Sequence, residues 1–366
     1  MIRILNVVTD MGRGGLETMI MNYYRKIDRS KLQFDFIVHR EKRETYDDEI
    51  ESLGGKIYRL PRLNPFSMQY RKKLGDFFDN HPEYQIIHVH QDCLSSVILK
   101  IALEHGVKVR IAHSHSSSQN KNIKYPIKLF YKKSIKKYAT DLLACSEEAG
   151  RWMFNSDDFE VLNNAIDAKR YIYDEHVRLD ARSKLGIKDD ELVIGHVGRF
   201  SPPKNHEFLI DIFNEIQKKR KAKLLLVGDG SLRTSIEEKV NRLELKDKVI
   251  FAGIQPNVDW WLQAMDIFLF PSIYEGLPLT IVEAQASGLR CYISDKVPIE
   301  CKKTDLVEQI CLSEGAQKWA QIILEKEMYD RRNTYEEICE AGFDVDKNAK
   351  WVEQYYISKE ERINGV

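Results

Sequence analysis

Short apolar runs alternate with helix-like segments along the whole chain, and this alternation restricts the fold more than any other feature. In the first half, the expected strands cover residues 2–8, 34–38, 86–90, 107–112 and 142–145. In the second half, they cover 192–197, 223–227, 249–251, 267–270 and 290–293. Strands separated by helices form parallel sheets built of βαβ units. The sequence therefore predicts an α/β protein with parallel sheets in both halves.

The segment from 167 to 190 is polar, rich in charge and without a strand pattern, so we place the domain boundary at its start. The expected domains are 1–166 and 167–345, and a chain of 366 residues is long enough for both. Open α/β sheets bind ligands beyond the carboxyl ends of their strands. We therefore expect two domains that face each other across a cleft, with functional residues directly after strands.

Composition and charge limit the partners of the chain. Lys plus Arg equals Asp plus Glu at 56 each, so the chain has no general attraction to nucleic acid, and none is expected as a partner. The six cysteines form no CxxC pair, which favours a reducing compartment. No apolar stretch approaches the roughly 18 residues of a membrane span. We expect a cytoplasmic protein.

A glycine-rich turn follows the first expected strand. Gly14 and Gly15 could bring the backbone close to a ligand. Glu17 occupies the third glycine position of a dinucleotide-binding turn, where a carboxylate would repel a pyrophosphate at the helix N-terminus. A nicotinamide cofactor is therefore disfavoured. The alternative is an ordinary strand-to-helix turn in which Glu17 favours the first helical turn.

Two histidines, His113 and His115, follow the expected strand 107–112. An imidazole at that edge of a sheet can donate to a sugar hydroxyl or a phosphate, or carry protons near neutral pH. The alternative is a pair of hydrogen-bonded structural histidines. The pattern does not distinguish which of the two would be functional.

Lysines recur at every fourth position of a segment that follows these histidines. The set comprises Lys124, Lys128, Lys132 and Lys136. On a single helix opened by Pro126 they would form one stripe beside apolar residues. Such a basic amphipathic helix is typical of contact with an anionic membrane surface or a lipid phosphate. The alternative is a solvated helix face.

The loop after strand 192–197 contains Gly198, Arg199, Lys204 and Asn205. Asn205 is placed as the N-cap of a helix over 207–217. Arg199 and Lys204 then frame a helix N-terminus, where two cations and free amides could bind a diphosphate. The alternative is two solvated basic residues in a loop.

Two acids follow strand 267–270. Glu275 lies in the loop and Glu283 in the helix that Pro278 opens. Two carboxylates at this spacing can accept hydrogen bonds from the hydroxyls of a sugar and a ribose, while the backbone amides of Gly276 and Leu277 remain free. The alternative is that Glu283 only lies on a solvated face.

One further acidic pair, Asp344 and Asp346, has the spacing of a metal-binding DxD motif. It precedes an amphipathic segment over 347–357, so Asp346 is expected to cap a helix, and no metal site is predicted.

In this order, the motifs resemble those of glycosyltransferase family 4, a retaining family with the GT-B fold of two Rossmann-like domains. The resemblance covers nearly the whole chain and includes members that act in capsule, exopolysaccharide and lipopolysaccharide biosynthesis. It implies that a final helix, 346–366, crosses back to the N-terminal domain. It also implies that the N-terminal domain serves the acceptor, that the C-terminal domain binds the nucleotide-sugar, and that no metal or cofactor is required.

The resemblance assigns roles to single residues. Donor binding falls to Gly14, Gly15, Gly198, Arg199, Lys204, Glu275, Gly276, Leu277 and Glu283. Catalytic roles fall to Arg199, Lys204, Glu275 and one of His115 and His113. In these roles Arg199 and Lys204 bind the diphosphate, Glu283 binds the ribose, and Glu275 contacts the sugar.

The resemblance also suggests the substrates. A UDP-sugar is the expected donor, with GDP-mannose second, and the expected acceptor is a lipid-linked saccharide or a polysaccharide at the inner face of a membrane. Two other functions stay open on the same fold: a nucleotide-sugar epimerase and a non-catalytic sugar-nucleotide-binding protein.

Overall fold

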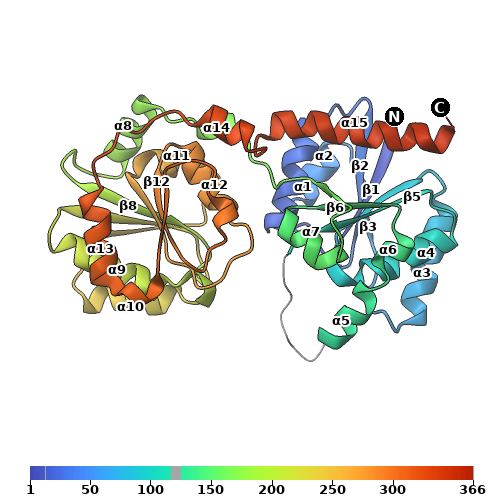
Figure 1. Cartoon of the computed structure of the whole chain (residues 1–366), viewed down its shortest axis with the longest axis horizontal. Coiled ribbons are helices and arrows are strands. Elements are labelled where there is room, and N and C mark those ends of the chain that lie inside the picture. Colours follow the sequence, from blue (N-terminus) through green and yellow to red (C-terminus); the bar gives the residue numbers. More distant parts are fainter. Residues whose placement is uncertain (13, 117–124, 366) are drawn as a thin grey trace. The chain divides into compact units, whose positions relative to one another are not determined.

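The computed structural model of the chain describes residues 1–12, 14–116 and 125–365. It divides into two compact units, and each has a parallel sheet between layers of helices (Figure 1). Unit 1 comprises Met1–Ala165 and Val345–Val366, and unit 2 comprises Ile166–Asp344. Each expected domain limit differs by one residue from the corresponding limit of these units.

The sheet of unit 1 has the strand order β3-β2-β1-β4-β5-β6-β7, and all its pairs are parallel. Its strands are β1 (Ile2–Val8), β2 (Leu32–Val38), β3 (Ile57–Arg59), β4 (Ile86–Val89), β5 (Val109–Ser114), β6 (Asp141–Ala144) and β7 (Glu160–Val161). The five expected strands are confirmed, whereas β3 and β7 are too short to show a pattern in the sequence. One boundary was wrong: β5 continues through His113, which therefore lies within the strand and not after it.

Helices cover both faces of this sheet and bury two apolar layers. The helices are α1 (Gly15–Lys26), α2 (Asp47–Ser52), α3 (Met68–Asn80), α4 (Ser95–Glu104), α5 (Tyr125–Lys132), α6 (Ile135–Tyr138), α7 (Glu147–Phe154) and α15 (Val345–Asn364), with a 3₁₀ turn η1 (Asp92–Leu94). Residues of α1 and α15 share one layer with β1 and β2, and residues of α3 and α4 share the other with β4. Alternate strand residues thus point into opposite layers.

The last helix, α15, belongs to unit 1, as the resemblance implied. Glu353 accepts a hydrogen bond from the backbone amide of Asp28 at 2.6 Å, and Lys359 pairs with Asp141 at 2.7 Å. The helix begins at Val345, so Asp346 lies in its first turn and pairs with Lys26 at 2.9 Å. Asp346 therefore lies inside the helix, and the expectation that it caps the helix was wrong.

The sheet of unit 2 has the order β10-β9-β8-β11-β12-β13, which is the Rossmann order. Its strands are β8 (Leu192–Val197), β9 (Ala222–Val227), β10 (Val249–Gly253), β11 (Ile267–Phe270), β12 (Arg290–Ser294) and β13 (Val307–Ile310). The five expected strands are confirmed, and all pairs are parallel. The Rossmann-like character of both domains is thus a property of the observed strand order.

The helices of unit 2 again cover both faces of the sheet. They are α8 (Glu175–Lys184), α9 (His206–Gln217), α10 (Arg233–Arg242), α11 (Val258–Ala264), α12 (Leu279–Ala286), α13 (Gly315–Glu325) and α14 (Tyr335–Glu340), with 3₁₀ turns at η2 (Ala168–Tyr171), η3 (Pro202–Lys204) and η5 (Ile299–Cys301). The polar segment 167–190 contains η2 and α8 and packs within unit 2. None of the helices in the described ranges is both long and apolar enough to cross a bilayer.

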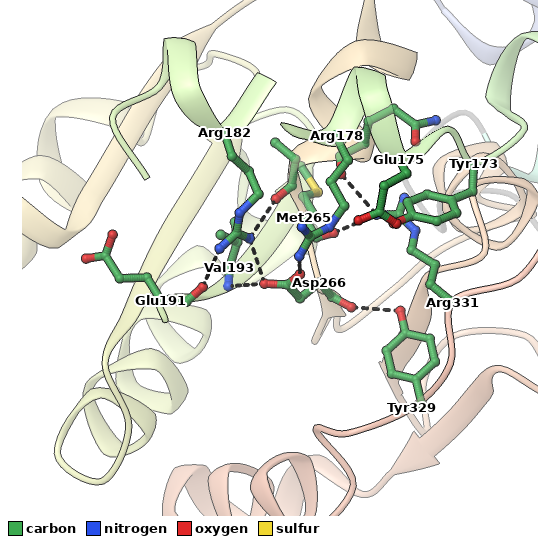
Figure 2. Close-up of polar contacts among 12 residues, drawn as sticks. Tyr173, Glu175, Arg178, Arg182, Glu191, Val193, Met265, Asp266, Tyr329 and Arg331 are labelled. Carbon is green, nitrogen blue, oxygen red and sulfur yellow. Dashed lines mark hydrogen bonds and ion pairs between the residues drawn. The ribbon is translucent and has the colours of Figure 1, made fainter. Parts of the chain in front are cut away.

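Asp266, just before β11, fixes the position of the strand that leads to the acidic loop (Figure 2). Its carboxylate accepts hydrogen bonds from Arg178 at 2.5 Å, from Arg182 at 3.0 Å and from the Val193 amide at 2.8 Å. Its carbonyl accepts from Tyr329 at 2.8 Å. These bonds join β11 to α8, to β8 and to the segment that precedes α14.

Arg331 acts on the helices that flank β11. Its guanidinium donates to the carbonyls of Leu262 and Gln263 at 3.0 Å and to those of Met265 and Ser287 at 2.8 Å. These carbonyls end α11 and α12, where helices lack internal partners. Burial lowers the pKa of Arg331 to about 10, so the cation is retained at neutral pH. One half-buried side chain therefore completes the ends of two helices.

Candidate functional site

The candidate site of unit 2 lies where the strand order of its sheet reverses. The chain adds β9 and β10 on one side of β8, and then crosses to add β11 on the other. The loops after β8 and β11 therefore leave the sheet next to each other, which is where open α/β sheets bind ligands. The Ile273 amide donates to the Pro203 carbonyl at 2.8 Å, so the two loops are in contact.

Asn205 ties these loops together. Its backbone has a left-handed φ of 54°, and its side chain makes no capping hydrogen bond to α9. The side-chain amide instead donates to the carbonyl of Pro271 at 3.1 Å. The expectation of an N-cap was right for the position of Asn205 and wrong for its side chain, because the neighbouring loop offers a carbonyl that needs a partner.

Lys204 and Glu275 form an ion pair across these loops. The Lys204 Nζ lies 2.8 Å from Glu275 Oε1, and the two side chains are only 19% and 11% exposed. The ammonium also lies 4.6 Å from the centre of the Phe270 ring, at the end of β11. The structure thus brings together the cation and the acid that the sequence placed in separate motifs.

Arg199 extends from the same loop into solvent. Its side chain is exposed and forms no ion pair with any residue that the structure describes. It is therefore available to an anionic ligand, and its position next to Gly198 at the end of β8 agrees with the expected diphosphate site.

A second glycine loop, which the sequence analysis did not identify, adjoins Gly198. Gly228 follows β9 with a φ of +136°, and a Cβ atom there would lie 2.1 Å from the Gly198 carbonyl oxygen. A Cβ on Gly230 would lie 2.5 Å from the carbonyl oxygen of Phe200. Only glycine permits this approach. The signal was a Gly-Asp-Gly sequence directly after an expected strand.

Glu283 faces a partner from outside the motif. The Tyr171 hydroxyl, at the end of η2, donates to Glu283 Oε1 at 3.0 Å. Desolvation raises the pKa of Glu283 to about 6, although the Tyr171 hydrogen bond and the charge of Arg170 act in the opposite direction. Sequence reasoning missed Tyr171, because η2 falls in the polar segment taken for a domain boundary.

The start of α12 leaves backbone donors unused. Pro278 stands at the N-cap position, and Gly276 is exposed. In the described ranges, the amides of Gly276 and Leu277 have no acceptor, as expected. Amides before a helix and a nearby cation form an anion-binding environment. Gly198, Arg199, Lys204, Glu275 and these amides thus lie at one sheet edge, with Glu283 on the following helix.

The remaining expected residues lie in unit 1. Gly14 precedes α1, and Gly15 is its first residue. A Cβ atom on Gly14 would lie 2.2 Å from Glu17 Oε2, whereas a Cβ on Gly15 would meet nothing within 4 Å. Glu17 thus lies in the first helical turn and folds back over its own N-terminus. A carboxylate at this helix N-terminus would repel a cofactor pyrophosphate.

His113 is enclosed in the core of unit 1. It is only 2% exposed, and its Nδ1 lies 3.0 Å from His88 Nε2. The other ring nitrogen of His88 lies 2.6 Å from the hydroxyl of Tyr356 on α15. These contacts favour the structural alternative for His113.

His115 lies beyond the end of β5 and is half-buried. Its Nε2 lies 2.8 Å from Nδ1 of His90, whose Nε2 lies 3.3 Å from Asn6 Oδ1. Burial lowers the pKa of His115 to about 3, so this imidazole is neutral at pH 7. This lowered pKa does not favour a proton carrier near neutral pH. The expected role of His115 as a donor to a sugar hydroxyl or a phosphate stays a prediction.

Three of these rings could in principle hold a metal. Within the described chain, His88, His90 and His113 offer nitrogen atoms within 4.8 Å of one another. The close nitrogen pairs between His88 and His113 and between His90 and His115 have hydrogen-bond distances, which require a proton between the rings. The cluster is therefore a hydrogen-bonded network, in which Nε2 of His113 and Nδ1 of His115 have no hydrogen-bond partner among the described residues.

The lysine stripe is interrupted. Lys124 lies outside the described residues, and the rest divides between α5 and α6, because the chain turns at 133–134 to bury Ile135. Lys132 lies 4.4 Å from the centre of the Trp152 ring, and Lys136 is exposed on α6. The expectation of one continuous basic helix was wrong.

Known proteins resemble the chain over both of its units. The model described as Glycosyltransferase Family 4 matches residues 13–170, and the model described as Glycosyl transferases group 1 matches residues 177–311. The "Putative glycosyltransferase EpsF" of Bacillus subtilis (strain 168) is 36% identical over 99% of this chain and 98% of its own. The capsular polysaccharide biosynthesis glycosyltransferase CapH of Staphylococcus aureus is 26% identical over 78% of this chain and 79% of its own.

The fold also matches a solved structure. The crystal structure of Anabaena Alr3699/HepE in complex with UDP and glucose superposes with a TM-score of 0.77, over 98% of this chain and all of that chain, at 17% identity. The GT-B fold expected from the sequence is confirmed.

Proposed function

Since the chain belongs to glycosyltransferase family 4 and is a glycosyltransferase, we propose that it transfers a sugar from UDP to a saccharide acceptor of polysaccharide assembly. The observation that carries this proposal is the pair of Lys204 and Glu275 at the reversal point of the unit 2 sheet. There, the cation that we propose for the leaving diphosphate lies next to the acid that we propose for the sugar hydroxyls.

The proposed reaction uses charge that is already in place. The bond between the anomeric carbon and the diphosphate oxygen breaks as the acceptor oxygen bonds to that carbon, with retention of configuration. The acceptor proton passes to a phosphate oxygen of the leaving UDP. Arg199 and Lys204 stabilise the negative charge of that phosphate, so we propose that no metal ion or other cofactor is required.

Other residues bind the donor before the reaction. We assign the ribose hydroxyls to Glu283, whose orientation Tyr171 fixes at 3.0 Å. We assign a phosphate oxygen to the amides of Gly276 and Leu277. The roles that the resemblance gave to Gly14, Gly15, His113 and His115 stay predictions; burial makes His113 the less suitable histidine.

The choice of substrates rests on relatives. Alr3699/HepE was crystallised with UDP and glucose, which supports a UDP-sugar donor. The name of CapH refers to capsular polysaccharide biosynthesis, which supports a saccharide acceptor. For a growing polysaccharide, we propose an acceptor carried on a lipid at the inner face of the membrane.

The test measures UDP release from a panel of UDP-sugars, with and without a lipid-linked saccharide. Acceptor-dependent release that persists in a metal chelator is expected. Lys204→Ala should lower turnover by about a hundredfold or more, the usual effect of removing one group that stabilises transition-state charge. Lys218→Ala, on the surface of unit 2, is the matched control and should behave as wild type.

The same assay distinguishes the alternatives. An epimerase would convert the donor without an acceptor and release no UDP. A non-catalytic binding protein would retain the donor unchanged. Either result, or full activity of Lys204→Ala, would contradict the proposal.

A further inference from the structure

Unit 1 has a large cavity at its own reversal point. The strand order of its sheet reverses between β1 and β4, and a cavity of about 780 Å³ opens beyond the ends of these strands. Thr9 follows β1 in its wall, and His90 and Gln91 follow β4. A cavity of this size at this position is typical of a ligand site in an open α/β sheet.

The lining of the cavity carries an excess of positive charge. Among the described residues of this lining, the cations are Arg40, Arg62 and Lys128, and the acid is Asp92. The chain as a whole is neutral, so this excess is local. Arg62 is exposed and has no side-chain partner in the described ranges, while Arg40 lies 3.9 Å from Asp10 at the limit of an ion pair. Two arginines with N–H donors left for a ligand favour a phosphate, because each guanidinium can donate two parallel hydrogen bonds to phosphate oxygens.

An apolar strip leads away from the cavity. Phe66 and Ile127 lie in its lining, and the Phe66 ring is 69% exposed. The centre of the Tyr131 ring lies 6.4 Å from that of Phe66 and 5.5 Å from that of Phe130, which is 68% exposed. Two exposed phenylalanine rings that contact the half-buried Tyr131 beside cations fit an apolar chain attached to an anion.

We infer that this cavity binds the acceptor through a phosphate group, and that the aromatic strip receives a long apolar chain attached to that phosphate. The acceptor class is a saccharide joined through a diphosphate to a lipid. Arg40 and Arg62 bind the diphosphate, and Phe66 and Phe130 contact the first part of the chain. This inference rests on the proposed function and adds the site and the chemistry of the acceptor.

The first experiment separates acceptor binding from donor binding. Arg62→Gln and Arg40→Gln should each raise the KM for a diphosphate-linked acceptor by about tenfold or more, the loss expected for a charge-assisted hydrogen bond. The affinity for UDP should not change. Arg43→Gln is the control, because Arg43 is an exposed arginine of the same unit that pairs with Asp48 and Glu51 and does not line the cavity.

The second experiment varies the acceptor. With a saccharide acceptor that has no phosphate, the arginine variants should have the same KM as wild type. Phe66→Ser and Phe130→Ser should raise the KM only for a long-chain acceptor and not for a short-chain diphosphate. All four side chains are exposed or line an open cavity, so these variants are expected to fold, which thermal unfolding checks.

The outcomes identify what fails. If wild type binds UDP but transfers to no acceptor, the proposed function fails. If wild type transfers and both arginine variants keep its acceptor KM, only this inference fails.

Anionic lipid headgroups carry the same phosphate chemistry, so co-sedimentation with phosphatidylglycerol vesicles is measured without acceptor. Equal binding of Arg62→Gln and wild type is expected there, and a loss confined to vesicles would overturn the assignment.

Discussion

The Nζ of Lys204 lies 2.8 Å from Oε1 of Glu275, so the cation expected at the donor diphosphate is already paired with the acid expected at the sugar. Both groups are largely shielded from water, which strengthens their attraction over that of a surface pair. A diphosphate that approaches Lys204 therefore competes with Glu275 for the same ammonium group. Donor binding and the position of the acid are coupled through this contact.

This coupling predicts opposite effects of one substitution on two measurements. Glu275→Gln removes the competing charge, so UDP should bind about tenfold more tightly, or about 1.4 kcal/mol. Transfer should nevertheless fall by about a hundredfold or more, because the sugar hydroxyls lose a charged acceptor. Calorimetric titration with UDP and the transfer assay measure the two effects. Weaker UDP binding in the variant would contradict the competition.

The raised pKa of Glu283 predicts a pH-dependent nucleotide affinity. Its pKa of about 6 means that the carboxylate becomes protonated as the pH falls below 6, and it then accepts ribose hydroxyls less well. UDP affinity of wild type should fall between about pH 7 and pH 5. Glu283→Gln should bind UDP more weakly at neutral pH and lack this decline. An identical pH profile in the two proteins would remove Glu283 from the nucleotide site.

The same pKa has the opposite consequence for stability. A carboxyl group with a raised folded-state pKa favours folding below the unfolded-state value near 4.5, and this contribution is lost as the pH rises through about 6. The shift corresponds to about 2 kcal/mol. Relative to wild type, Glu283→Gln should therefore gain about 2 kcal/mol in unfolding free energy between about pH 4 and pH 7.5. Chemical denaturation at the two pH values measures this gain.

The histidine network predicts acid sensitivity of unit 1. Burial lowers the pKa of His88 to about 3, so its proton is taken up mainly in the unfolded state. The contribution of the neutral ring to the free energy of unfolding is fully present above the unfolded-state pKa near 6.5. It is lost as the pH falls, by up to about 1.4 kcal/mol per pH unit for each such ring. Protection of the β4 and β5 amides from hydrogen exchange should decrease below pH 6.5. His88→Asn should reduce this slope, whereas the exposed His176→Asn should not.

The contacts of Arg331 predict that its substitution strongly lowers the free energy of unfolding, although Arg331 is not a residue of the candidate site. Arg331→Met leaves the carbonyls at the ends of α11 and α12 without donors, which should cost about 3 kcal/mol or more. The adjacent Arg332 pairs on the surface with Asp305 and Glu337, so Arg332→Met should cost less than about 1 kcal/mol. Urea denaturation followed by tryptophan fluorescence compares the two. Equal losses would show that the carbonyl contacts are not the cause.

Local pattern was sufficient for the strands and for the order of the motifs. β8 and β11 were expected with their observed limits, because a buried parallel strand is a continuous apolar run. Gly198 and Glu275 could be placed after these strands for the same reason. The histidines show where this reasoning fails: His113 is polar and ended the apolar run, yet the strand continues through it, because neighbouring imidazoles supply its hydrogen-bond partner.

The sequence by itself determined the alternation of strands and helices, the two sheets and the positions of the motifs at strand ends, because these follow from periodicity over a few neighbouring residues. Only the tertiary structure decided that Lys204 pairs with Glu275, that Asn205 bonds to Pro271 instead of capping its helix, and that Tyr171 meets Glu283. Each of these contacts joins residues that are distant in the chain. Their partners are set by how strands order within a sheet, and no local window of sequence contains that order.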